Sequence, residues 1–182
     1  MILDNLLMFD STLAPRNLAQ VAGNYVSTNI IDLGITSGIP TSASGGGARD
    51  IGIGDDPAMK LLVMVTTAFT SAGAATLTVN LQGAVDNGAG APAAFSTWWA
   101  SPAYALATLA VVGARLLDMD MPRPPAGIAI PRYLQLQYVI GAATTTAGQV
   151  VAGIVLDRDD QDYQGTGNAV YGGYPPGITI AN

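Results

Sequence analysis

The sequence predicts an all-β protein built as one antiparallel sandwich or barrel. Apolar and polar residues alternate in several short runs, and clusters of Gly, Pro, Asn and Ser separate these runs. Glu is absent and Lys60 is the only lysine, so two of the strongest helix formers are almost missing. The 182 residues fit a single domain, which we place at residues 1–157, followed by an extended C-terminal arm at 158–182.

The first half of the chain holds three strand candidates. Residues 25–34 form a weak one. Residues 60–69 are almost continuously apolar, which predicts a strand in the middle of a sheet with both faces covered. Residues 75–83 alternate strictly, with Leu and Val on one face and Thr, Asn and Gln on the other. That pattern predicts a strand with one buried face.

The second half begins with a helix signal. Ser101 can serve as an N-cap with Pro102 at the first helical position, so we expect at most a short helix near residues 101–112. The remaining strand candidates are residues 115–121 and 133–140, which alternate, and residues 149–157, which are more continuously apolar.

Two stretches share one plan. Residues 60–86 and 132–157 each contain a cation, an apolar strand, a connection of Thr, Ala and Gly, a second strand and an Asp. We predict that each forms a β-hairpin; an internal repeat is the alternative explanation for their similarity. The small residues of the second connection suit a flat contact with another surface, and we expect Ala142 and Thr145 to contact a partner there.

Three segments lack strand periodicity. Residues 35–50 and 86–95 are loops by composition, and the region after Asp157 has many turn residues and little alternation. Because such a tail can hardly offset its own ordering entropy, we expect it to become ordered against a partner or against its own domain.

The composition excludes several classes of function. The chain has no His and no Cys, so imidazole catalysis, thiolate nucleophiles, disulfides and zinc-thiolate sites cannot occur within one chain. A net charge of -6 disfavours nucleic-acid binding, which depends on clustered Lys and Arg. No apolar run reaches the ~18–20 residues of a membrane span, and the N-terminus lacks the basic region of a leader. We therefore expect no nucleic-acid or membrane partner.

Paired carboxylates offer little chemistry. Asp55 and Asp56 precede a proline and fit a solvated turn. A second acidic cluster, residues 157–168, mimics part of a calcium loop, but Tyr171 stands where the bidentate Glu should be. A solvated acidic tail is the preferred interpretation, with calcium as the alternative.

Aromatic residues provide better candidates for an interface. Trp98 and Trp99 are adjacent, so in a regular strand they would point to opposite faces, and one of them could anchor a partner. In the tail, rigid aromatic contacts could come from Tyr163, Tyr171 and Tyr174.

Five segments, taken in order, resemble the jelly-roll capsid cement (decoration) proteins of short-tailed bacteriophages. The segments are "MILDNLLMFD", "STNIIDLG", "ARDIGIGDDP", "VTTAFTSAGAATLTVNLQGAVDN" and "PRYLQLQYVIGAATTTAGQVVAGIVLDR". The resemblance covers most of residues 1–158. It departs from the family pattern in the loop at 35–47, in the enlarged region 88–104 and in the long tail.

The resemblance implies an antiparallel jelly-roll β-sandwich on the outside of an icosahedral phage shell. Such a protein bridges neighbouring major capsid protein subunits of the HK97-like fold, and it uses no catalysis and no cofactor. We expect synthesis in the host cytoplasm, a place on the capsid exterior, and a homodimer or homotrimer, because closed symmetry suits sites on a symmetric shell.

Two other functions stay open. A jelly-roll module of a phage tail or fibre could bind carbohydrate or a receptor, with the tryptophans and the tail tyrosines stacking on sugars. A hydrolase with paired Asp residues would need two carboxylates that face each other across a cleft. Copy number per virion separates the first alternative from a cement protein.

Overall fold

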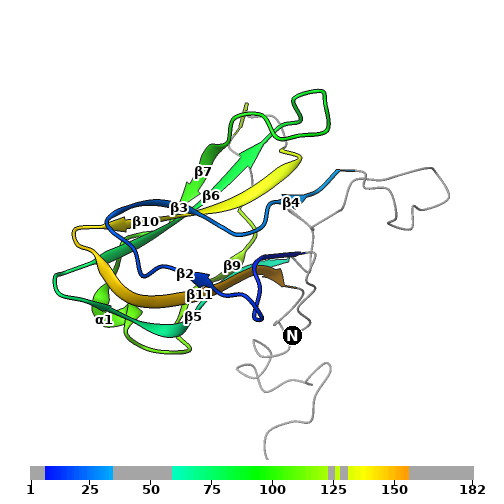
Figure 1. Cartoon of the computed structure of the whole chain (residues 1–182). Coiled ribbons are helices and arrows are strands. Elements are labelled where there is room, and N and C mark those ends of the chain that lie inside the picture. The colour runs from blue at the N-terminus through cyan, green and yellow to red at the C-terminus, as the bar shows by residue number, and fades with distance from the viewer. Residues whose placement is uncertain (1–6, 35–58, 123–125, 128–130, 156–182) are drawn as a thin grey trace, which may run out of the picture.

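Two antiparallel sheets pack face to face in the computed structural model, which describes residues 7–34, 59–122, 126–127 and 131–155. In these residues the sheets form a sandwich with one short helix (Figure 1), which confirms the predicted fold class.

The first sheet has five strands. Its path is β1-β11-β5-β9, and β2 also pairs with β11. The bounds of these strands are β1 Met8–Asp10, β2 Arg16–Asn17, β5 Lys60–Ser71, β9 Arg115–Asp120 and β11 Thr145–Val155. The two continuously apolar stretches therefore occupy β5 and β11 in the middle of the sheet, as predicted.

The second sheet has six strands. Its path is β3-β10-β6-β7, with β4 on β10 and β8 on β6. The bounds of these strands are β3 Gly23–Val26, β4 Ile31–Asp32, β6 Thr76–Ala84, β7 Ser96–Ala100, β8 Tyr104–Ala105 and β10 Tyr133–Gly141. With the short strands merged into their neighbours, eight strands form two four-stranded sheets in the order of a jelly roll. Consecutive strands lie in different sheets except for β6 and β7, which are neighbours in the second sheet.

The prediction of two hairpins is wrong. β5 and β6 lie in different sheets, and so do β10 and β11. β5 pairs with β11, and β6 pairs with β10 in an unbroken register from Tyr133–Ala84 to Gly141–Thr76. Each Thr/Ala/Gly connection thus crosses from one sheet to the other as an arch. Alternation defines which face of a strand is buried, but it does not define the strand's partner.

Alternate residues of both sheets fill the space between them. β6 contributes Leu77, Val79 and Leu81, and β10 contributes its even-numbered residues from Leu134 to Ile140. From the other sheet, the core receives among others Phe9, Leu61, Val63, Val65, Phe69, Val150, Ala152 and Ile154. The alternation that predicted β6 and β10 is therefore the pattern that buries one face of each.

The single helix differs from its prediction at its start. α1 spans Leu106–Leu109, inside the predicted range, but its N-cap position is Ala105, which makes no side-chain cap. Ser101 instead accepts a hydrogen bond from the N–H of Val79 (2.9 Å), so its hydroxyl joins the segment before the helix to β6.

Candidate interaction surfaces

The two arches meet at one end of the sandwich. Ser71 Oγ donates to the carbonyl of Thr144 (2.6 Å), and the hydroxyls of Thr70 and Thr146 are hydrogen-bonded (2.7 Å). A Cβ added at Gly73 would lie 2.9 Å from the Cβ of Ala143. We call residues 71–75 and 141–146 the arch tips. Their side-by-side packing leaves no room for larger residues between them.

The arch tips present small, uncharged side chains to solvent. Ala72, Ala74, Ala142 and Thr144 are exposed. Ala142 has a φ of 63°, a left-handed conformation that a side chain seldom adopts, so the backbone there is held by its surroundings. A surface of this kind can approach another protein closely, because no long side chain must be ordered or moved.

Thr145 differs from Ala142 in its position. Its side chain is only 3% exposed. The hydroxyl donates to the carbonyl of Leu18 and accepts from the N–H of Gln20 (3.1 Å). Thr145 therefore links the arch tips to residues 18–20 through its hydroxyl. The sequence predicted that this side chain contacts a partner directly, and its burial does not fit such a contact.

The two tryptophans do not point to opposite faces. Leu81 pairs with Trp99 and Gln82 pairs with Thr97, so Trp98 is an extra residue in β7 and forms a bulge. Both indoles are partly buried against the core. The site of a Cβ on Gly83 would be 2.2 Å from Trp98 Nε1, which shows how closely this ring covers the glycine. The bulge explains the difference from the prediction.

A small pocket lies beside Trp98. It has a volume of about 110 Å³ and is lined by Gly83, Ala84, Val85, Ala94, Ser96, Trp98 and Pro131. Its walls are mostly apolar. Because Trp98 packs near the end of β6 and the arch tips adjoin its start at Thr76, the tryptophans and Ala142 do not form one site.

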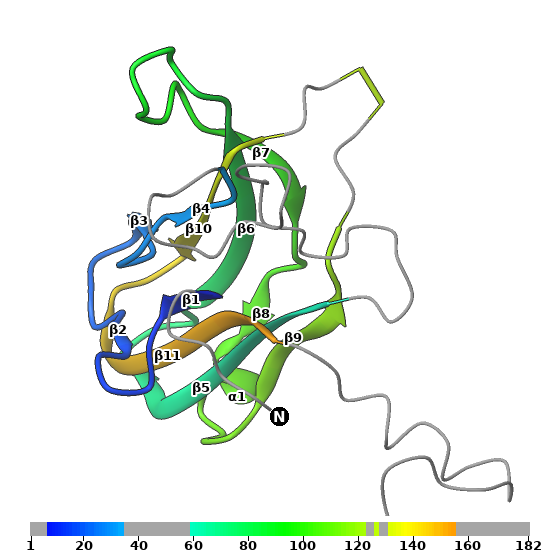
Figure 2. The ribbon, with the colours of Figure 1, turned by 90° about the vertical axis from the view of Figure 1, so that its right-hand side faces the viewer.

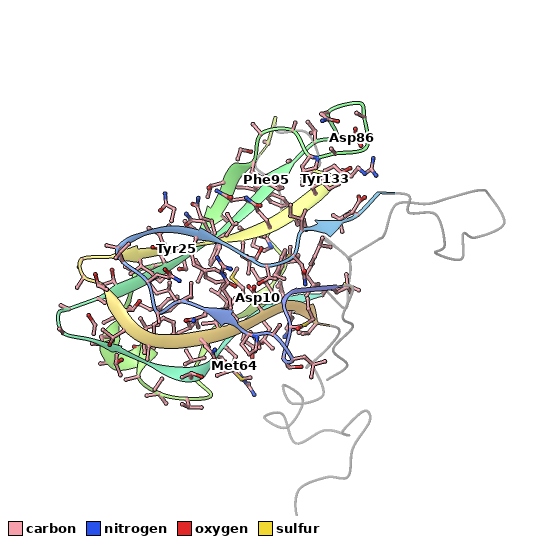
Figure 3. The ribbon with its side chains drawn as sticks, viewed as in Figure 1. Asp10, Tyr25, Met64, Asp86, Phe95 and Tyr133 are labelled. Atoms are coloured by element: carbon pink, nitrogen blue, oxygen red, sulfur yellow. The ribbon has the colours of Figure 1, made fainter. Side chains whose placement is uncertain are left out.

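An ion-pair network closes the end of the sandwich beyond the pocket. Arg132 Nε and Nη2 donate to the two carboxylate oxygens of Asp32 (2.9 and 3.0 Å), and Nη1 donates to Asp86. The guanidinium also lies 4.9 Å from the ring centre of Tyr133. These contacts fix the loop after β6, where Asp86 lies (Figure 3). In this loop, Asp86 accepts a hydrogen bond from the N–H of Gly88 (2.6 Å).

Sequence reasoning missed this network. Its members are 100 and 46 residues apart along the chain, so no local pattern connects them. One signal was available in the sequence: Arg132 begins the second of the two similar stretches, 132–157, and Asp86 ends the first, 60–86. Only the antiparallel pairing of β10 with β6 brings these two ends together.

The outer face of the second sheet carries side-chain amides joined in rows. Gln135 Nε2 donates to Gln82 Oε1 (2.7 Å), and Gln82 Nε2 donates to Thr97 Oγ1 (3.1 Å). Beside them, Asn80 Nδ2 donates to Gln137 Oε1 (3.0 Å). The rows cross β10, β6 and β7 and contain no charge. Gln82 and Gln135 are each only 8% exposed, so this part of the rows is a buried polar network that joins the strands.

A buried carboxylate joins the N-terminal strand to the core. Asp10 is fully buried between the sheets (Figure 3). It accepts from the hydroxyl of Tyr138 (2.7 Å) and from the N–H of Thr28 (2.8 Å). An irregularity between Met8 and Asp10 in the pairing with β11 turns this side chain inward. These bonds satisfy the carboxylate internally and give it a structural role.

Other candidates lie outside the described residues. These are Tyr163, Tyr171 and Tyr174, the acidic cluster at 157–168, Asp55 and Asp56, and the arm itself. Within the part that the structure does describe, no three metal-binding side chains come together, and no helix is long and apolar enough to span a bilayer.

The structure is a jelly-roll sandwich. Its candidate interaction surfaces are the arch tips at one end and the pocket beside Trp98. A family model described as Bbp16 matches residues 18–154, which is most of the chain and nearly all of the sandwich. The chain belongs to the Bbp16 family and is a phage-related protein. A search of the curated proteins finds no match.

Proposed function

We propose that this protein is a structural virion protein, a capsid cement or decoration protein. It binds the outer surface of an icosahedral phage shell of the HK97-like fold, bridges neighbouring major capsid protein subunits and stabilises the shell. It works without catalysis or a cofactor and associates with itself as a dimer or trimer. The observation that carries the proposal is a jelly roll of a phage-related family whose arch tips present small, uncharged side chains.

The arch tips are the proposed shell contact. Two arches that come from distant parts of the chain support each other there through two hydrogen bonds and the close approach of Gly73 to Ala143, so the surface keeps its shape without a partner. A preformed surface loses little conformational entropy when it binds. Small side chains at Ala72, Ala74 and Ala142 also allow the backbone to come close to the shell protein.

The charge distribution supports a place outside the shell. The described residues hold five Asp and four basic residues, whereas the remaining eight Asp lie in the other segments. The chain as a whole carries -6, which repels packaged DNA. The nearly neutral sandwich can then approach a protein surface without a large electrostatic penalty.

A tail or fibre module that binds carbohydrate is the second candidate. The pocket beside Trp98 favours it, because aromatic rings commonly line ligand sites. Two features weigh against this alternative. The pocket of about 110 Å³ is below the usual range of about 300–1,000 Å³ for ligand sites. Both indoles are also partly buried against the core, which reduces the ring area available for stacking.

Co-sedimentation with shells built from the phage's own major capsid protein tests the proposal. We expect saturable binding at a copy number comparable to that of the shell subunits. The variant Ala72→Trp should weaken binding by about tenfold or more, because the indole holds the tips away from the shell. Ala89→Trp, at an exposed alanine of the loop after β6, is the matched control. Binding at only a few sites per shell would favour the tail module.

A further inference from the structure

One sheet edge lacks the usual protection against pairing with another strand. In natural proteins, charges, bulges, proline or very short strands prevent an edge strand from pairing with another chain. At the other edges, β9 carries Arg115, Asp118 and Asp120, β7 contains a bulge, and β1 has three residues with an irregular register. β3, with the sequence GNYV, has no charge, no proline and a regular register with β10. The strand itself is protected by its short length, and the same edge continues, after residues 27–30, into β4, which carries Asp32.

The free side of β3 can be assigned from its pairing. The N–H of Ser27 donates to the carbonyl of Leu136 on β10 (2.8 Å). Because successive peptide groups of an antiparallel strand point to opposite sides, those of Asn24 and Val26 point away from β10. Within the described part of the chain, β3 pairs with β10 alone.

Exposed aliphatic side chains gather in the segment that contains this strand. We call residues 11–31 the N-terminal wall. Of the seven exposed large hydrophobic side chains in the described residues, four belong to it: Leu13 (97%), Val21 (63%), Val26 (44%) and Ile30 (47%). Its only charged residue is Arg16. Figure 2 shows β2 and β3 together on one side of the sandwich, opposite β7 and β9.

We propose that a second copy of this chain docks on the N-terminal wall, with the two β3 strands pairing antiparallel about a two-fold axis. With the axis at Tyr25, the peptide groups of Asn24 face those of Val26 of the partner subunit. The second sheets of both copies then join into one continuous sheet. The inference deepens the proposed function, on whose self-association it rests.

The surface favours a second copy over another partner for two reasons. A free strand edge is complementary to itself, because the same donors and acceptors recur when it is turned by 180°. Each chain also carries -6, so two copies repel each other least where charge is nearly absent, and the wall is such a place. Val26 lies in β3 itself, so the pairing brings this exposed aliphatic side chain next to the partner's strand.

Sedimentation velocity of the full chain tests the docking surface. We expect the wild type to be a dimer and Val26→Lys to raise the dissociation constant by about tenfold or more, because it places two like charges at the new strand pair. Val112→Lys is the matched control: Val112 is 62% exposed and lies beyond α1, away from the wall, so this variant should stay dimeric. Circular dichroism verifies that both variants fold. A monomeric wild type, or a dimeric Val26→Lys variant, would refute the inference.

Disulfide formation tests the register, since the chain has no cysteine of its own. Directly paired residues have Cα atoms about 5.5 Å apart, within the range that a disulfide spans. We expect a mixture of Asn24→Cys and Val26→Cys chains to form a mixed disulfide dimer on oxidation. Neither variant alone should do so efficiently, because like positions are two residues out of register. Equal cross-linking of Asn24→Cys with Val112→Cys would contradict the proposed contact.

The same variants separate this inference from the proposed function. If the wild type binds shells in stoichiometric amounts but is a monomer in solution and on the shell, the cement role stands and the docking surface is wrong. If the wild type forms the cross-linked dimer but does not bind shells, the docking surface stands and the cement role is wrong.

Discussion

Replacing Tyr138 by Phe removes a buried hydrogen bond to a carboxylate and leaves the side chain otherwise unchanged. The hydroxyl lies 2.7 Å from Asp10 Oδ2, and both side chains are fully buried. Hydrogen bonds to charged groups contribute about 1.5–3 kcal/mol, and a carboxylate deprived of a donor in the interior keeps its desolvation cost. Thr28 N–H would be its only remaining donor among these contacts. We therefore expect Tyr138→Phe to lower the free energy of unfolding by about 1.5–3 kcal/mol.

Urea denaturation at pH 7 measures this loss directly. For a chain of this size, each kcal/mol corresponds to about 2–4 °C in Tm, so calorimetry should show a decrease of about 3–12 °C. Tyr25→Phe is the matched control, because the hydroxyl of Tyr25 donates to the carbonyl of Val21 at an exposed site (2.9 Å). A loss no greater than that of the control would refute the reasoning that Asp10 depends on Tyr138.

The same tyrosine predicts a loss of stability in alkali. Burial, together with the charge of Asp10 and the hydrogen bond to it, raises the pKa of Tyr138 well above its usual value, although Arg16 acts in the opposite direction. The folded state thus keeps this proton when the unfolded chain releases it. Stability from this group is present below about pH 10 and falls as the pH rises further. Tyr138→Phe should reduce that decline.

Two further predictions concern the end of the second sheet. Gly83→Ala places a Cβ 2.2 Å from Trp98 Nε1, so the indole must move. We expect a red shift of the tryptophan fluorescence and a decrease of about 1–3 kcal/mol in the free energy of unfolding. An unchanged spectrum would contradict the packing. Burial by itself raises the pKa of Asp86. Hydrogen bonds from loop N–H groups and the charge of Arg132 lower this pKa by more than burial raises it, so the net pKa lies below the ordinary value. Asp86→Asn should therefore destabilise the protein at pH 7. In urea titrations the difference should shrink as the pH falls below about 4, the ordinary pKa of Asp, and through the lowered pKa of Asp86. A difference independent of pH would exclude the ion pair.

The interaction surfaces could be predicted only in part. The small residues of the arch connections were visible in the sequence, and Ala142 is exposed as expected. Thr145 has a similar local context but is buried, because its hydroxyl binds residues 18–20 from the other end of the chain. Composition reports the size and polarity of a side chain, whereas its exposure depends on which distant segment covers it.

The sequence by itself determined the longer strands and their buried faces, but it did not predict β1, β2, β7 or β8. Alternation predicted β6, β9 and β10, and continuous apolar runs predicted the central strands β5 and β11, because side-chain direction in a strand is a local property with a period of two. The near absence of Glu and Lys correctly indicated that little helix would form.

Only the tertiary structure decided which strands pair. The two stretches predicted as hairpins are arches. β5 pairs with β11 and β6 pairs with β10, and both partners lie far away along the chain. That pairing brings Arg132 to Asp86. The pairing of β7 with β6 contains the bulge that turns Trp98 inward, and among the described residues β3 pairs with β10 alone. Pairing depends on the packing of both sheets at once, and no single stretch of sequence contains that information.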